Sequence, residues 1–140
     1  MEPRGKRYTA PEIDIYFDPR TCIHAARCVA GLPDVFVPDA RPWIRPEKAT
    51  ADALADIVKQ CPSGALHYVR KDRGAAEVPE ATVSVTMVPG GPLYVRGDLD
   101  IVARDGSLVR HDYRVALCRC GHSQNKPFCD NSHIAAKFEG

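Results

Sequence analysis

The sequence lacks any long apolar run. No segment approaches the roughly 18 consecutive apolar residues that a membrane-spanning helix needs, and residues 1–12 are polar, without the apolar core of a signal peptide. We therefore expect a cytoplasmic protein that has no membrane partner.

An excess of charge of either sign is also missing. Lys and Arg number 19 against 18 Asp and Glu, which gives a formal net charge of +1, and both halves of the chain are balanced. Proteins that bind nucleic acids usually carry a strongly basic face, so we expect no nucleic-acid partner. The sequence also has no Gly-rich phosphate loop, no nucleophile beside a base and no paired carboxylates within a motif. These absences indicate that the protein is not an enzyme.

Cysteine, in contrast, is plentiful, with six residues in a chain of 140. Without a secretory signal the compartment is expected to be reducing, which keeps thiols free to bind metals, and we predict no structural disulfide. The cysteines fall into two groups, between Cys22 and Cys61 and between Cys118 and Cys129. The sequence therefore predicts two separate metal-binding regions.

The C-terminal group lies in CRCGHSQNKPFCDNSH, residues 118–133. One residue separates Cys118 from Cys120, so the backbone must curl before both sulfurs can reach one centre. Cys129 and His133 are four residues apart, which predicts that they share one face of a short helix, with Asp130 in its first turn. Three thiolates and an imidazole could also enclose a single tetrahedral zinc ion, so the ligand types alone leave that alternative open.

The residues between these ligands resemble the pattern of the CDGSH iron–sulfur domain, the family that includes mitoNEET. The matching positions are Cys118, Cys120, Ser123, Pro127, Cys129, Asp130, Ser132 and His133. The resemblance spans residues 81–140 and implies a [2Fe-2S] cluster, with Cys118 and Cys120 on one iron and Cys129 and His133 on the other. One position departs from the family, because Asn131 replaces its glycine. Asn tolerates left-handed backbone conformations, so we expect the loop to be unharmed.

The N-terminal group fits a ferredoxin frame incompletely. Bacterial ferredoxins space cysteines by two, two and three residues, with Pro after the last. In that frame Cys22, Cys28 and Cys61, which precedes a proline, are ligands, and Ala25 occupies the position of the second cysteine. Three cysteines in such a window can also be ordinary buried residues.

Residues 13–68 resemble the divergent single-cluster ferredoxin family, on the stretches HAARC, GLPDVF and CPSGAL. That family often lacks the second ligand. The resemblance implies a [3Fe-4S] cluster, or a [4Fe-4S] cluster with a non-cysteine fourth ligand, for which His24 is a candidate.

Hydrophobic periodicity predicts an α+β fold in which a small ferredoxin-like domain (residues 1–70) and a β-rich CDGSH-type domain (81–140) flank a polar linker (71–80). Residues 1–12 are expected to form a loosely held arm. A helix should begin after Thr50 and carry Cys61 on its apolar face. Strands are predicted at residues 13–17, pairing with 66–70, and at 83–87, 93–96, 99–103 and a last segment ending at 117.

These features predict a two-cluster iron–sulfur protein for single-electron transfer, whose partner is a reductase or an electron acceptor. The alternative is a redox or iron sensor that stores its [2Fe-2S] cluster or transfers it to an apo-acceptor protein. A β-rich domain of this size buries little core, and the resembling families form dimers, so we expect a homodimer. Arg114, Arg119 and Lys126 are expected either to offset the charge of the second cluster or to form a solvated face.

Overall fold

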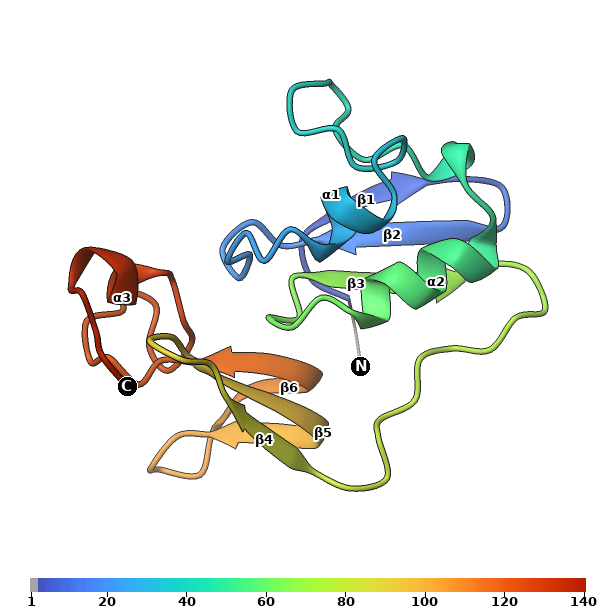
Figure 1. The fold of residues 1–140 in the computed structure, drawn as a ribbon. Helices are drawn as coiled ribbons and strands as arrows, with labels where there is room; N and C mark the ends of the chain where they lie inside the picture. Colours follow the sequence, from blue (N-terminus) through green and yellow to red (C-terminus); the bar gives the residue numbers. More distant parts are fainter. Residues whose placement is uncertain (1–2) are drawn as a thin grey trace.

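A computed structural model describes residues 3–140 as a small mixed α and β structure with two three-stranded sheets (Figure 1). The strands are β1 (Lys6–Thr9), β2 (Ile13–Phe17), β3 (Leu66–Arg70), β4 (Ser84–Met87), β5 (Leu93–Val102) and β6 (Leu108–Leu117), and the helices are α1 (Arg27–Gly31), α2 (Ala51–Lys59) and α3 (Ser132–Ala135). Within residues 3–140, no helix combines the length and the apolarity needed to cross a membrane.

The first sheet has the order β1-β2-β3 and is antiparallel throughout. The predicted pairing of residues 13–17 with 66–70 is confirmed, from Ile13 opposite Arg70 to Phe17 opposite Leu66. The prediction of a loose N-terminal arm is wrong for residues 6–9, which form β1 against β2; residues 1–2 lie outside the described residues. The strand β1 is largely exposed, so its sequence shows no alternation of apolar and polar residues.

Helix α2 packs across this sheet. The Thr50 hydroxyl caps its N-terminus by accepting the Ala53 N–H at 3.1 Å, as predicted. Leu54 and Val58 are fully buried in a core that includes Ile15 and Phe36. The helix ends at Lys59, so Cys61 lies in the turn after it rather than on the helical face, which corrects the prediction. Helix α1, which contains Cys28, carries no fully buried residue and was not predicted from the apolar pattern.

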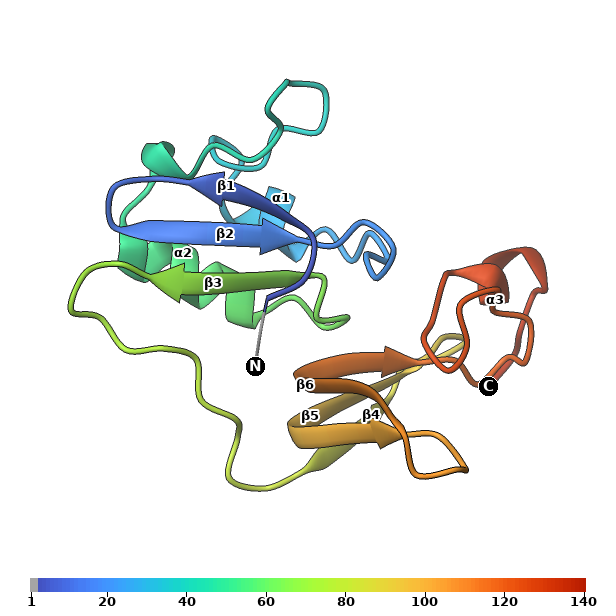
Figure 2. The same ribbon diagram turned by 180° about the vertical axis from the view of Figure 1, so that it is seen from behind.

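The second sheet has the order β4-β5-β6 (Figure 2). The prediction of two separate strands at 93–96 and 99–103 is wrong, because β5 is continuous. A shift in register between Arg96 and Leu99 lets it bend past Gly97, where φ is +146°, without breaking the pairing with β6. Residues 71–83, between the two sheets, form neither helix nor strand.

The two faces of the second sheet have different partners. Val95 and Val115 point to one face and pack with Leu99 and Phe128 in a small apolar cluster. The alternate residues point towards the first half of the chain, where the Arg96 guanidinium donates to the Lys59 carbonyl at 3.0 Å. The second sheet is therefore attached to the first half through one of its faces.

Two fully buried charged residues of β6 build this attachment. The Arg114 guanidinium, with 1% of the residue exposed, forms two hydrogen bonds to the Glu77 carboxylate at 2.9 and 3.0 Å. It also donates to the carbonyls of Cys61 at 2.8 Å and Leu66 at 2.9 Å. Because these partners come from the first half and from the connecting segment, Arg114 joins three parts of the chain.

Asp112, with 0% exposed, is the second of these residues. Its carboxylate contacts the His67 imidazole at 2.9 Å and accepts a hydrogen bond from the Arg4 guanidinium at 2.8 Å. Burial alone would raise the pKa of Asp112, but the contacts with His67 and Arg4 outweigh burial and hold the pKa at about 2. The carboxylate is therefore ionised and paired inside the attachment.

Gly64 lies where the first half of the chain packs against the β6 backbone, and Gly64→Ala should lower the free energy of unfolding by at least about 2 kcal/mol. Its φ is +74°, and an added Cβ would lie 2.3 Å from the Arg114 carbonyl oxygen, which is backbone and cannot move cheaply. Denaturant unfolding followed by circular dichroism measures the change.

Gly106→Ala is the matched control, because Gly106 has φ +91° but no atom within 4 Å of an added Cβ. It should show the conformational cost alone. Equal losses in the two variants would mean that the close approach at Gly64 contributes nothing.

Candidate metal centres

The C-terminal cysteines lie at the end of β6, where backbone pairing folds the chain back on itself. The Cys118 N–H donates to the Pro127 carbonyl, and the Cys129 N–H donates to the Ala116 carbonyl, both at 2.8 Å. The buried Ser123 hydroxyl donates to the Phe128 carbonyl at 2.6 Å and tightens the loop between them. This pairing brings Cys129 beside Cys118 although they are far apart in the sequence.

The four predicted donors line one small hollow, and they are grouped two and two. The Cys118 and Cys120 sulfurs are 3.7 Å apart, and the Cys129 sulfur is 3.6 Å from Nδ1 of His133. Two donors on one tetrahedral metal, with bonds of about 2.3 Å to sulfur and about 2.0 Å to nitrogen, would be about 3.8 Å (S···S) or about 3.6 Å (S···N) apart. Each pair therefore has the spacing of two ligands that share a metal.

The pairs do not merge into one larger group. Among residues 3–140, no three His, Cys, Asp or Glu side chains converge as the ligands of a single metal ion would. A binuclear cluster, with a pair of ligands on each iron, fits this arrangement of donors better than a single zinc ion does.

Asn131 adopts the left-handed conformation, with φ 71° and ψ 7°, which confirms that it can replace the glycine of the CDGSH pattern. Helix α3 begins only at Ser132, so Cys129 and Asp130 precede the helix, contrary to the prediction that they lie in it. His133 still reaches Cys129, because the turn at Asn131 redirects the chain.

Asp130 holds the ligand loop together instead of stabilising a helical turn. Its carboxylate accepts the N–H groups of Ser132 at 3.0 Å and Gln124 at 2.8 Å. Hydrogen bonds from Ser132 and Gln124 hold the pKa of Asp130 at about 2, so the group is charged at neutral pH.

The N-terminal cysteines surround a cavity of about 500 Å³ between β2, α1 and the turn after α2. Cys22, Cys28 and Cys61 all line it, together with Ala25 and His24. The volume falls within the range of about 300–1,000 Å³ that is usual for small-molecule and cofactor sites. The structure thus brings together the three predicted cysteines, and it places the alanine of the incomplete ferredoxin pattern beside them.

Trp43 packs against the core of the first sheet and also lines this cavity. Its ring contacts Phe17 edge-on at a centroid distance of 4.9 Å and lies 5.8 Å from the ring of Phe36. The aromatic side chain therefore closes one side of the space around the thiols.

Two residues of the N-terminal ligand loop have a backbone conformation that is unusual for their type. His24 and Ala26 have φ of 55° and 64°, in the left-handed region that disfavours residues with a Cβ. Such conformations cluster where the surrounding structure enforces a functional geometry. Here they curl the chain between Cys22 and Cys28, and both cysteines face the same cavity.

The same local turn recurs at three cysteines in the two sites. The sulfurs of Cys22, Cys120 and Cys129 each accept, at 3.4 Å, the backbone N–H of the residue two positions later. Hydrogen bonds of this kind stabilise a thiolate and are one means by which proteins set the potential of an iron–sulfur cluster.

Burial and these hydrogen bonds have opposite effects on the pKa values of the thiols. Burial raises the pKa of the Cys22 and Cys129 thiols, and that of Cys28 to about 11. Burial also opposes ionisation of Cys118, but there backbone hydrogen bonds from Ser123 and Gly121 bring the pKa below its usual value. The buried thiols therefore need a bound cation to become thiolates, and metal binding at these sites would release protons.

The predicted role of Arg114 near the second cluster is wrong. Its side chain is buried and points towards Cys61 of the first site, so it neither forms a solvated face nor lines the second site. Arg119 does line the hollow between the C-terminal donors, where its guanidinium donates to the Val88 carbonyl at 2.8 Å. The sequence signal for Arg114 would have been its position: it alternates with the apolar residues of β6 and follows Asp112 on the same face.

Comparisons with known proteins find a family match in each half of the chain. Residues 8–71 match the family model described as a divergent 4Fe-4S mono-cluster. The "Uncharacterized protein YjdI" of Escherichia coli K12 is 38% identical over 64 residues, which cover 46% of this chain and 84% of that protein. The chain belongs to the divergent 4Fe-4S mono-cluster family. The YjdI protein of Escherichia coli O157:H7 matches to the same extent.

The second half carries a further family match. Residues 90–134 match the model described as an iron-binding zinc finger of CDGSH type. Both predicted families are thus confirmed, in the predicted order. The protein is an iron–sulfur protein in which a mono-cluster domain contains the first site and a CDGSH domain contains the second.

Proposed function

We propose that this protein transfers single electrons through two iron–sulfur clusters, one in each domain, with residues 71–80 as the linker. Cys118 and Cys120 would hold one iron of a [2Fe-2S] cluster, and Cys129 and His133 the other. The observation that carries this assignment is the grouping of the four donors into two pairs with tetrahedral spacing. When bound, the cluster supplies a centre that accepts and releases one electron.

For the first site we propose that Cys22, Cys28 and Cys61 hold a [3Fe-4S] cluster, or a [4Fe-4S] cluster with a non-cysteine fourth ligand. The three thiols around one cavity support this assignment. His24 lines the same cavity and is the candidate for a fourth ligand. In either form the domain's own contribution is to fix three thiolates and exclude solvent with apolar side chains such as Trp43.

Protein purified without oxygen tests the proposal. We expect iron and sulfide sufficient for two clusters per chain, two distinct EPR signals during reduction, and full recovery of the visible spectrum on reoxidation. Reversible cycling without loss of iron supports electron transfer. A colourless protein with one zinc ion per chain would contradict the proposal, because zinc has no redox chemistry.

Ala25→Cys should complete the ligand set of the first site. Ala25 lines the cavity beside the three thiols, so a sulfur there is placed to bind the iron that lacks a cysteine. A wild-type [3Fe-4S] centre should gain one iron and lose the EPR signal of its oxidised state. A [4Fe-4S] centre with a non-cysteine ligand should keep its iron and change its reduced spectrum.

Ala30→Cys is the matched control, because Ala30 lies on α1 and is not among the residues that line the cavity. It adds a thiol without supplying a ligand, so the spectrum should stay that of wild type. If Ala25→Cys also left iron content and spectrum unchanged, the first site would not be a cluster of this type.

A second candidate function is storage of the [2Fe-2S] cluster, or its transfer to an apo-acceptor protein. One observation favours this function. His133 lies in the four-residue helix α3, where the residue after it, Ile134, is 68% exposed, so little structure holds this ligand in place. Stopped-flow mixing with an apo-ferredoxin separates the two functions. Rapid loss of the second cluster to the acceptor would favour transfer, whereas retention during repeated redox cycles favours an electron carrier.

We further propose a homodimer formed through the uncovered edge of the second sheet. Val115, Val95 and Val85 lie opposite one another on adjacent strands, with exposures of 0%, 8% and 60%. The apolar row thus continues out of the small core to the edge strand β4, where Met87 is 69% exposed. A second copy would cover this edge.

Val85→Lys should raise the dissociation constant of this dimer at least about tenfold, because each dimer would bury two unpaired ammonium groups. Light scattering should give twice the 15.4 kDa chain mass for wild type and a concentration-dependent decrease for the variant. Val69→Lys, a change at a 40% exposed valine in the first sheet, should leave the mass unchanged. A wild-type mass of 15.4 kDa at micromolar concentration would rule out the dimer.

A further inference from the structure

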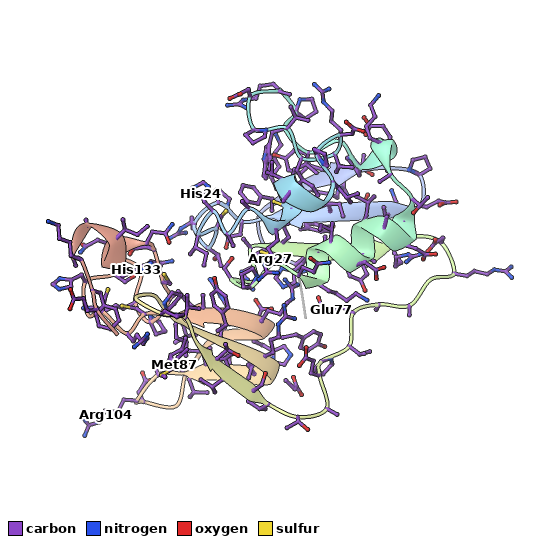
Figure 3. All side chains as sticks on the ribbon, viewed as in Figure 1. His24, Arg27, Glu77, Met87, Arg104 and His133 are labelled. Atoms are coloured by element: carbon purple, nitrogen blue, oxygen red, sulfur yellow. The ribbon has the colours of Figure 1, made fainter. Side chains whose placement is uncertain are left out.

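The ligand loops of the two sites face each other, on the same side of the molecule in Figures 1 and 2. In Figure 3, His24 and His133 mark these two loops, one from each domain. Asn131 makes a direct contact between them, because its side-chain amide donates to the Ile23 carbonyl at 2.8 Å. The residue at the end of this bond immediately follows Cys22.

A continuous series of three hydrogen bonds joins a sulfur of one site to a sulfur of the other. The Ile23–His24 peptide group donates its N–H to the Cys22 sulfur at 3.4 Å and accepts the Asn131 amide at its carbonyl. The backbone N–H of Asn131 in turn donates to the Cys129 sulfur at 3.4 Å. One peptide group and one residue, Asn131 with its side chain and backbone N–H, therefore span the whole distance between Cys22 and Cys129.

Apolar packing closes the space around this series. Ile23, Ala116 and Cys129 form a buried cluster across the two domains, and Tyr94 packs against it. Side chains of both domains thus pack together between the two sites.

The identity of residue 131 is the strongest indication that this contact between the two sites has a functional role. The CDGSH pattern has glycine here, and the left-handed backbone of Asn131 would suit glycine at least as well. Asparagine adds a side-chain amide, and this amide donates its hydrogen bond to Ile23 of the other domain instead of to a group in the local turn. A second asparagine, Asn125, also crosses to the first domain, but it bonds the Arg20 carbonyl at 3.0 Å and has no N–H on a sulfur.

We propose that Asn131 is a positioning residue that couples the two metal sites, so that an electron passes between them within one chain. The inference rests on the proposed function. In this step the site of lower potential is oxidised by one electron and the other is reduced by one, with no proton, bond or leaving group involved. An external one-electron reductant supplies the first electron. Imidazole at His133 is neutral where a thiolate is negative, which favours the second site as the acceptor.

The test compares wild type with Asn131→Gly and Asn131→Asp in the anaerobically purified full chain. Glycine keeps the left-handed turn and the backbone N–H, and aspartate keeps the size of the side chain but cannot donate to a carbonyl. EPR of fully reduced wild type should show that the signal of the second site relaxes faster, and is broader, than the signal of a centre with no paramagnetic neighbour. Freeze-quench EPR after adding half an electron equivalent of dithionite should show redistribution between the sites, slowed at least about tenfold in both variants.

Asn125→Ala is the matched control, because it also removes one amide-to-carbonyl bond between the domains. It should retain the relaxation and the redistribution rate of wild type. Equal slowing in Asn125→Ala would assign the effect to docking in general and overturn the role of Asn131.

Two further outcomes separate the inference from the proposed function. Wild type that has both cluster spectra but shows no relaxation enhancement and no redistribution would overturn the coupling alone. Wild type that lacks either cluster spectrum would overturn the proposed function, and the coupling with it. Variants that keep both spectra and exchange electrons as fast as wild type would overturn the assignment to Asn131.

Discussion

Arg114→Met should lower the free energy of unfolding by about 3–5 kcal/mol, among the largest effects expected of a single substitution in this chain. The change removes the partner of the Glu77 carboxylate inside the attachment between the domains. It also leaves the carbonyls of Cys61 and Leu66 without their donor. Denaturant unfolding under anaerobic conditions, followed by circular dichroism, measures the loss.

The double variant Arg114→Met with Glu77→Leu shows whether the stability is lost because a buried charge is left uncompensated or because packing is lost. Replacing both members of a buried ion pair by apolar residues of similar volume is often neutral, whereas breaking it leaves an uncompensated charge. The double variant should therefore recover a large part of the stability that Arg114→Met loses. Asp56→Ala, which removes a surface pair with Lys59 at 3.5 Å, should change stability by less than about 0.5 kcal/mol. An Arg114→Met protein as stable as wild type would mean that the pair does not hold the domains together.

His133→Cys should lower the reduction potential of the second site by on the order of 0.1 V, because a thiolate adds negative charge where imidazole was neutral. The new sulfur would lie beside Cys129, which His133 already contacts at 3.6 Å. A spectroelectrochemical titration measures the shift. The potential of the first site serves as an internal reference in the same sample.

His122→Ala is the control for loss of a histidine from the same motif. His122 is exposed, and its backbone N–H, which the substitution keeps, is the group that bonds the Cys120 sulfur. The second site should keep its potential and its spectrum in this variant. If His133→Cys titrated at the wild-type potential with an unchanged spectrum, His133 would not be a ligand, and the [2Fe-2S] assignment would have to be abandoned.

The parts of the fold that the sequence predicts well are those with a local physical cause. The Thr50 cap, the pairing of β2 with β3 and the left-handed Asn131 depend on capping chemistry, alternation and backbone preference within a few residues. The short spacings of Cys22 with Cys28 and of Cys118 with Cys120 likewise predict that each pair comes together, because a short loop limits how far apart the thiols can lie. These features need no knowledge of the rest of the chain.

The errors have tertiary causes. Strand β1 is exposed and is held by pairing with β2, so its sequence shows no periodicity. The register shift that keeps β5 in one piece depends on its partner β6. Arg114 was misassigned for the same reason: its alternation with the apolar residues of β6 could have indicated burial, but nothing near it in the sequence indicates that a carboxylate from residue 77 will meet it. Contacts between the halves of the chain cannot be inferred from patterns within one half.

Glu77 lies in the middle of the segment that joins the two domains, and its carboxylate is fixed on Arg114. The connecting segment is therefore fixed in place and does not act as a flexible linker. The local concentration of one domain at the other is set by packing instead of by linker length. Two separate redox proteins must find each other by diffusion, at a rate that varies with their abundance and with the salt of the medium. In this chain the two sites are brought together by folding, so dilution or salt should leave the proposed exchange between them unchanged.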